Sequence, residues 1–287
     1  MNNKNIFSRA SFSALFCFFA VLGALPCASF ARQWPDSQQA LVSSFAAARQ
    51  GAFSRGLHFE TSEERVQAWG DGELIWSSSE YNSASLPGKG LVVLEHEDGF
   101  RSTYEGVDVR PDLKDKVSEG DWLGYSGISG WSFIVTDFRQ GRIVDPLGLL
   151  PARVIEGRPR LGSIELSRGS EVLPVTDRMQ ILPGRWSLTV DAVYTGISNT
   201  VPVEISLYWL GTRVGFVKLD SLEEQDGVIV LNAPGPLNYE AVYSRQGYFV
   251  FNDIAFNEGR GILELRLKDE KGKVLSRVWN LVVRNVQ

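Results

Sequence analysis

The chain has 287 residues, of which 44% are hydrophobic and 22% charged, and its formal net charge is −5. This length and apolar content allow one large core or two modest ones, and 28 glycines and 8 tryptophans with 2 methionines indicate a β-rich globular protein rather than a disordered one. An acidic chain without basic clusters argues against nucleic acid or an anionic membrane surface as a partner.

The N-terminus has the pattern of an export signal. Residues 1–9 carry two cations and no acid, residues 12–26 form an apolar run, and residues 29–31 read Ser-Phe-Ala. This order predicts a signal peptide over residues 1–31 and a protein of the periplasm or cell envelope. An uncleaved membrane anchor is the alternative, because the apolar run approaches spanning length. Both cysteines lie in this leader, so cleavage would leave no thiol for a disulfide or a metal.

Residues 32–51 are predicted to form a short amphipathic helix that lies on the following domain. Asp36 or Ser37 can cap its first turn, and Leu41 and Phe45 are four residues apart, which places them on one helical face.

The next part of the chain alternates short apolar runs with glycine-bearing turns, which predicts strands joined by tight connections. The apolar runs are residues 91–94, 122–125 and 133–135, and residues 66–69 and 73–76 are predicted to be the two strands of a hairpin. Turns are expected at Gly70-Asp71-Gly72, at Glu119-Gly120 and at Gly127.

The order of motifs resembles the β-sheet core of the M23 (LytM-type) peptidoglycan metallopeptidases. Arg55-Gly56-Leu57 resembles the centre of the family's first metal motif, and Tyr104-Glu105-Gly106 resembles its "Y-x-H" strand. Residues 117–127 (VSEGDWLGYSG) resemble its "V-x-x-G-D-x-[IL]-G-x-x-G" segment, and Val144-Asp145-Pro146 resembles its final motif. The resemblance implies a LytM-type antiparallel sheet over residues 52–150.

The resemblance also implies where a metal site would be, but the residues at those positions are different. Ser54 occupies the position of a histidine ligand of the family, and His58 the position of its aspartate ligand. Ser132 and Ile134 occupy the positions of the "H-x-H" pair, and Gly106 that of a further histidine. Catalytic zinc needs three imidazole or carboxylate ligands and one open position for water. The whole chain has two histidines, so no shift of alignment supplies the missing ligands. We therefore expect no catalytic residue, no metal and no cofactor.

The two histidines have plain interpretations. His96 is interpreted as a hydrogen-bonded turn residue, because no third imidazole exists to join it in a metal site. A weak metal site of His58 with Glu60 and Glu105 is an open alternative to a solvated surface histidine.

Three residues are candidates for the rim of the groove that the family uses. Tyr104, Glu105 and Trp131 could contact a ligand there, because aromatic side chains stack on sugars and anchor protein partners. Trp131 follows Gly130 at the start of a strand and is the surface candidate, whereas Phe133 is expected in the core.

The rest of the chain is β in pattern. Residues 151–160 carry two prolines and a glycine and are predicted to be a linker. Candidate strands in residues 161–287 are 163–167, 186–194, 203–210, 212–219, 228–231, 248–255, 262–268 and 274–283. Short strands at this spacing predict an antiparallel sandwich of the immunoglobulin-like type. This part has no histidine or cysteine, so we expect a docking or spacing role.

Together these patterns predict an all-β protein: a LytM-type core, then an immunoglobulin-like β-sandwich, with a short N-terminal helix. The resemblance implies a non-catalytic envelope protein that binds peptidoglycan, or that regulates or scaffolds a cell-wall hydrolase or another envelope protein, because degenerate members of the family regulate amidases. An active zinc peptidase with unorthodox ligands and a purely structural envelope protein are the alternatives. No membrane contact beyond the leader is expected.

Overall fold

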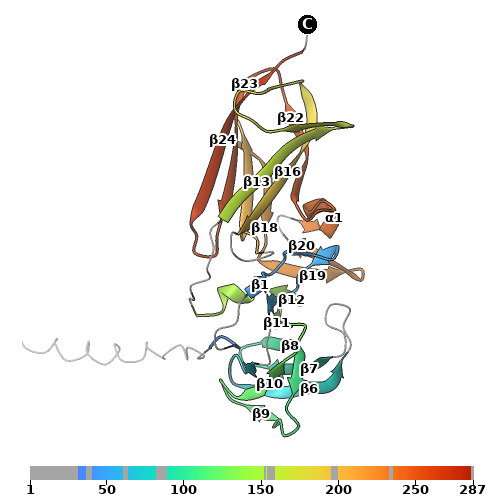
Figure 1. Ribbon diagram of the computed structural model, residues 1–287, viewed down its shortest axis with the longest axis vertical. Helices are drawn as coiled ribbons and strands as arrows, with labels where there is room; N and C mark the ends of the chain where they lie inside the picture. The colour runs from blue at the N-terminus through green and yellow to red at the C-terminus, as the bar shows by residue number, and fades with distance from the viewer. Residues whose placement is uncertain are drawn as a thin grey trace, which may run out of the picture. The chain divides into compact units, whose positions relative to one another are not determined.

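The computed structural model describes residues 32–36, 41–60, 64–81, 89–151, 153, 159–194, 200–232 and 235–285. The leader and most of the expected linker lie outside these residues. Strands dominate the described part of the chain, as predicted, together with a 3-10 turn η1 (Pro146–Gly148) and a single helical turn α1 (Tyr239–Val242) (Figure 1). No helix among the described residues has the length and apolar character to cross a membrane.

The first part of the chain forms an antiparallel sheet in which the predicted strands are confirmed. Its strands are β4 (Leu57–Phe59), β5 (Arg65–Gln67), β6 (Gly72–Tyr81), β7 (Lys89–Glu95), β8 (Phe100–Val109), β9 (Lys116–Val117), β10 (Trp122–Ser126), β11 (Trp131–Asp137) and β12 (Arg142–Val144). The main order is β12-β11-β8-β7-β6-β9, with β4 also paired to β11 and β10 bridging β5 and β8. The strand β11 therefore lies at the centre of the sheet, between β8 and β4.

The core of this sheet is aromatic. Trp69, Tyr104, Trp131 and Phe133 are fully buried, and the ring of Trp131 stacks on Phe59 with a centroid distance of 4.6 Å. Side chains alternate between the two faces of a strand, so Trp131 and Phe133 of β11 point to the same side. Burial of such large apolar side chains stabilises this part of the chain.

The predicted helix over residues 32–51 is wrong where the structure describes it; residues 37–40 lie outside the described part. Strand β1 (Leu41–Ser43) pairs with β4, and β2 (Ala48–Arg49) forms a tight hairpin with β3 (Ala52–Phe53). Backbone φ angles of +53° at Ala46 and +51° at Gln50 interrupt any helix. Leu41 and Phe45 are both buried, but one lies on a strand and the other in the turn that follows it.

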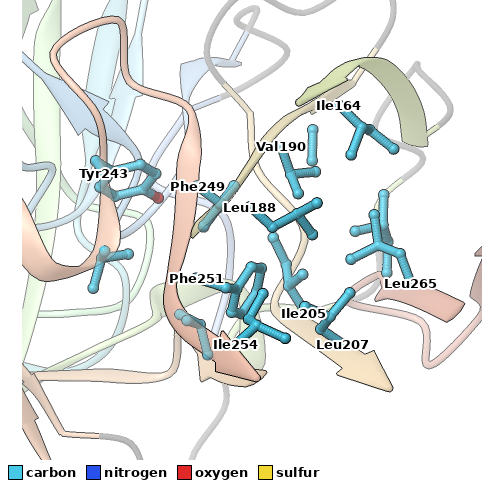
Figure 2. Packing of buried hydrophobic residues seen from close by; sticks show 14 of the residues in the cluster. Ile164, Leu188, Val190, Ile205, Leu207, Tyr243, Phe249, Phe251, Ile254 and Leu265 are labelled. Atoms are coloured by element: carbon cyan, nitrogen blue, oxygen red, sulfur yellow. The ribbon is translucent and has the colours of Figure 1, made fainter. Parts of the chain in front are cut away.

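The C-terminal part forms two sheets around a shared core, and seven of the eight strands predicted for it lie in these sheets. The eighth, residues 228–231, is a strand but pairs outside them. The strands of these sheets are β13 (Pro159–Arg168), β14 (Glu171–Pro174), β15 (Gln180–Ile181), β16 (Gly184–Tyr194), β17 (Glu204–Trp209), β18 (Thr212–Lys218), β22 (Phe249–Phe256), β23 (Gly259–Lys268) and β24 (Val274–Val283). One sheet has the order β14-β13-β16-β22 and the other β15-β24-β23-β17-β18, with β15 parallel to β24. Figure 2 shows Leu188 of β16 and Phe251 of β22 in one cluster with Ile205 and Leu207 of β17, so side chains from both of these sheets pack together.

Two segments cross the predicted domain boundary. Between β18 and β22 the chain forms β19 (Ser221–Gln225), β20 (Val228–Asn232) and β21 (Pro236–Leu237), and β19 pairs with β12, so these strands extend the first sheet. In the opposite direction, Phe45 and Phe53 belong to the core cluster of the two-sheet part. The buried hydroxyl of Tyr243 donates to the carbonyl of Ala46 at 2.9 Å. Strands from the C-terminal part therefore belong to the first sheet, and side chains from the N-terminal part belong to the C-terminal core.

Candidate functional site

A cleft of about 710 Å³ lies beside the central strands of the first sheet. Three parts of the chain line it: residues 49–56 around the β2–β3 hairpin, residues on β8 and β11, and residues 227–229 with Tyr239 and Glu240 from the C-terminal part. Four of the positions singled out in the sequence line this cleft, namely Ser54, Glu105, Ser132 and Ile134. The C-terminal part thus supplies one wall, which the sequence did not predict.

Strand register explains why these side chains meet. Ser132 and Ile134 are two residues apart on β11, so they share the face opposite to that of Trp131 and Phe133. Ser132 is paired with Glu105 of β8 on one side and with His58 of β4 on the other. The three side chains therefore form a row across the middle of the sheet.

His58 is a buried, neutral imidazole. Its Nδ1 lies 3.1 Å from Ser132 Oγ, and its Nε2 lies 3.4 Å from Nη2 of Arg49. A guanidinium only donates, so Nε2 accepts a long hydrogen bond from Arg49, and Nδ1–H donates to Ser132. Burial, followed by the positive charge of Arg49, lowers the pKa of His58 from 6.5 to about 4. The lone pair that a metal would need already faces a cation.

Gly130 makes room for this ring. Its φ is +86°, and an added Cβ would lie 2.6 Å from the Phe59 carbonyl oxygen and 3.0 Å from His58 Nε2. A side chain at this position would clash with the Phe59 carbonyl and crowd the His58 ring, in a backbone conformation that favours glycine.

The cleft contains a second arginine, which is paired with a buried acid. Nη2 of Arg55 lies 3.0 Å from Oε1 of Glu105, whose side chain is 7% exposed. Burial raises the pKa of Glu105, and the charges of Arg55 and Arg49 oppose that shift. Burial lowers the pKa of Arg49, and Glu105 partly offsets this. Sequence reasoning missed both arginines: Arg55 was visible inside the motif, whereas Arg49 reaches the cleft only because of the β2–β3 hairpin.

The residues at the implied metal positions do not fit a zinc ion. The Ser54 hydroxyl donates to the Gly56 carbonyl at 2.9 Å, Ile134 offers only hydrocarbon, and His58 faces a guanidinium. The alternative site of His58, Glu60 and Glu105 is not assembled, since the described residues bring together no group of three potential ligands of that kind. Gly106 has a φ of +86°, so a histidine there would strain the backbone by about 1 kcal/mol or more.

The expected places of Tyr104 and Trp131 at the rim are wrong. Both side chains are fully buried on the core face of the first sheet. Side chains along a strand point alternately to its two faces, and these two residues occupy positions that point into the core. The Tyr104 oxygen accepts a hydrogen bond from the Trp69 backbone N–H at 2.8 Å, and burial raises its pKa to about 12. Of the three rim candidates, Glu105 lines the cleft, and the aromatic side chains found there are Phe53 and Tyr239.

The interpretation of His96 as a hydrogen-bonded turn residue is confirmed. Its Nδ1 donates to the Asp71 carbonyl at 2.7 Å, and its Nε2 accepts from the hydroxyl of Ser102 at 2.8 Å. Burial lowers its pKa, so the ring favours the neutral form that this arrangement requires.

A second cleft, of about 610 Å³, is lined by both parts of the chain around η1. Asp145 accepts a hydrogen bond from the Leu147 backbone N–H at 3.0 Å and thereby caps this turn. Burial raises the pKa of Asp145 from 3.8 to about 7, with Glu270 and Asp220 adding to the shift and the Leu147 bond opposing it. This carboxyl group is therefore partly protonated near neutral pH.

Comparisons with known proteins give weak likenesses. A protein-family model matches residues 158–284, less than half of the chain, from the start of β13 to the end of β24. No curated protein matches the chain.

Solved structures similar to this chain include proteins of the class that the motifs resemble. A chain of the SpoIIQ–SpoIIIAH pore-forming complex is 17% identical over 44% of this chain and 94% of its own length, with a TM-score of 0.35. A mutant catalytic domain of the M23 protein EnpA from Enterococcus faecalis is 21% identical over 37% of this chain and 85% of its own, with a TM-score of 0.30. Lysostaphin is 13% identical over 88% of this chain and 98% of its own length, with a TM-score of 0.33. TM-scores this low do not establish a shared fold.

Proposed function

We propose that this chain is an exported, non-catalytic protein of the cell envelope that binds peptidoglycan in the 710 Å³ cleft. One observation carries the proposal: the positions that the M23 resemblance assigns to metal ligands hold Ser54, His58 and Ile134, and the cleft beside them is still open. Loss of the metal removes hydrolysis, whereas a polar cleft of this size can still hold a ligand.

The C-terminal part has a place in this proposal. The order β13-β16-β22 in one sheet and β24-β23-β17 in the other corresponds to the A-B-E and G-F-C orders of immunoglobulin-type sandwiches, which supports the inferred immunoglobulin-like module. Its excursion β19–β21 and the turn α1 supply Val228, Ile229 and Tyr239 to the cleft. We infer that this module shapes the binding site, in addition to any spacing role.

The test is co-sedimentation of the purified exported chain with insoluble peptidoglycan, with and without added zinc. We expect binding without release of soluble fragments in either condition. Val228 lines the cleft and is 52% exposed, and Val274, on β24, is exposed to the same extent but lies outside the cleft lining. Val228→Trp should reduce binding at least fivefold, because the indole occupies space in the cleft, whereas Val274→Trp should bind as the wild type does.

Three results would overturn the proposal. Zinc-dependent release of fragments that is lost in His58→Ala would establish an active peptidase. Equal binding by wild type, Val228→Trp and Val274→Trp would move the interaction away from the cleft. Absence of binding to peptidoglycan, with capture of a purified cell-wall hydrolase instead, would replace the glycopeptide ligand with a protein partner.

A further inference from the structure

We infer that Arg49 and Arg55 make the cleft a carboxylate site, which selects a short peptide that ends in a free α-carboxylate. The inference rests on the proposed function, since it names the ligand class of the same cleft.

The first argument is the charge of the cleft floor. Among the described residues, Arg55 has Glu105 as its carboxylate partner, while the hydrogen bond of Arg49 goes to the neutral ring of His58. Two guanidinium groups therefore share one buried carboxylate. Glu240 also lines the cleft, but it comes from α1 on the C-terminal wall. The floor beside β8 and β11 keeps an excess of positive charge.

The second argument is the number of donors. A guanidinium has five N–H donors in a planar fork that matches the two oxygens of a carboxylate. The hydrogen bond to His58 occupies Nη2 of Arg49, and the one to Glu105 occupies Nη2 of Arg55, so each group keeps further donors. The Arg55 side chain is 44% exposed, and both arginines line the cleft. A carboxylate that enters the cleft would meet these donors in a partly desolvated place, where charge-assisted hydrogen bonds are strong.

The remaining lining suits the rest of a short peptide. Phe53, Ile134, Val228, Ile229 and Tyr239 give the cleft an apolar side next to its charged floor. A volume of about 710 Å³ is in the range of small-ligand sites, which fits a peptide of a few residues better than a folded partner.

The experiment compares two probes: acetyl-alanyl-alanine as the free acid and the same dipeptide as its C-terminal amide. Binding to the exported chain is measured by NMR titration. We expect the acid to bind at least tenfold more tightly than the amide. Arg49→Gln should remove most of this preference and keeps an N–H donor for His58. Arg277→Gln is the matched control, because Arg277 is exposed on β24, and it should keep the preference.

Arg55 needs a paired design, since Arg55→Gln alone leaves the buried Glu105 without its cation. The double variant Arg55→Gln, Glu105→Gln keeps a neutral hydrogen-bonding pair and should also lose most of the preference for the acid. Circular dichroism and thermal unfolding check that each variant folds.

The outcomes separate this inference from the proposed function. If acid and amide bind equally, or neither binds, the carboxylate site is refuted even when peptidoglycan still sediments the protein. If the acid is preferred through both arginines but peptidoglycan does not bind, the site stands and the proposed function fails. Peptidoglycan whose carboxylates have been converted to amides with a carbodiimide and ammonia should bind at least tenfold more weakly if the wall supplies the carboxylate. Unchanged binding would refute that source.

Discussion

Replacing His58 with Gln should change how the stability of the protein depends on pH. The pKa of His58 is 6.5 in a model peptide and about 4 in the folded chain. Between these values the unfolded chain binds a proton that the folded chain does not bind, so the free energy of unfolding rises with pH across this window. The shift corresponds to about 3 kcal/mol in full, and to about 2 kcal/mol after allowance for partial solvation of the site.

Asp145 produces the opposite trend in nearly the same window. Its pKa rises from 3.8 to about 7 on folding, so here the folded chain binds the extra proton and the free energy of unfolding falls as the pH rises to about 7. In the wild type the two contributions oppose each other. In His58→Gln only Asp145 contributes of the two, and its contribution to the free energy of unfolding falls as the pH rises. In Asp145→Asn only His58 contributes, and its contribution rises with pH.

The assay is urea unfolding at several pH values between about 4.5 and 7, at constant ionic strength, for the wild type and both variants. Relative to the wild type, we expect the gain in stability from about pH 4.5 to pH 6.5 to be about 1 kcal/mol smaller in His58→Gln, because this interval covers only part of the titration, and larger in Asp145→Asn. His96 titrates in all three proteins and therefore cancels in the comparison. Parallel curves for His58→Gln and the wild type would refute the buried, arginine-facing histidine.

Two further predictions follow from the site. Trp131→Ala should lower the free energy of unfolding by about 3–5 kcal/mol, because the ring is fully buried and stacked on Phe59, and urea unfolding measures this; a loss under about 1 kcal/mol would contradict the burial. Dialysis against zinc followed by elemental analysis should find no stoichiometric metal, and EDTA should leave the melting temperature unchanged, because His58 faces Arg49; one tightly bound zinc lost in His58→Ala would contradict this.

The sequence alone determined most of the strands of the two parts and the number of histidines that the chain can offer. Alternating apolar residues and glycine turns are local signals, so β10, β11 and the strands of the C-terminal sheets could be predicted from neighbouring residues. The number of histidines is a property of composition that no folding can change.

Tertiary structure decided which residues reach the cleft. The spacing of Leu41 and Phe45 fits a helix, but strand pairing of residues 41–43 and packing of Phe45 in the C-terminal core favour a strand and a turn. Trp131 was expected at the surface because it follows a glycine, whereas its direction depends on which face of β11 the rest of the sheet covers.

The same reason explains Arg49 and the C-terminal wall. Arg49 lies nine residues before His58 and reaches it through the β2–β3 hairpin, and β19 joins the first sheet by pairing with β12, which lies far away in the sequence. Local sequence patterns indicate that a segment is a strand, but its partner and its exposed face depend on contacts between distant residues, because hydrogen bonding and burial are satisfied only in the assembled fold.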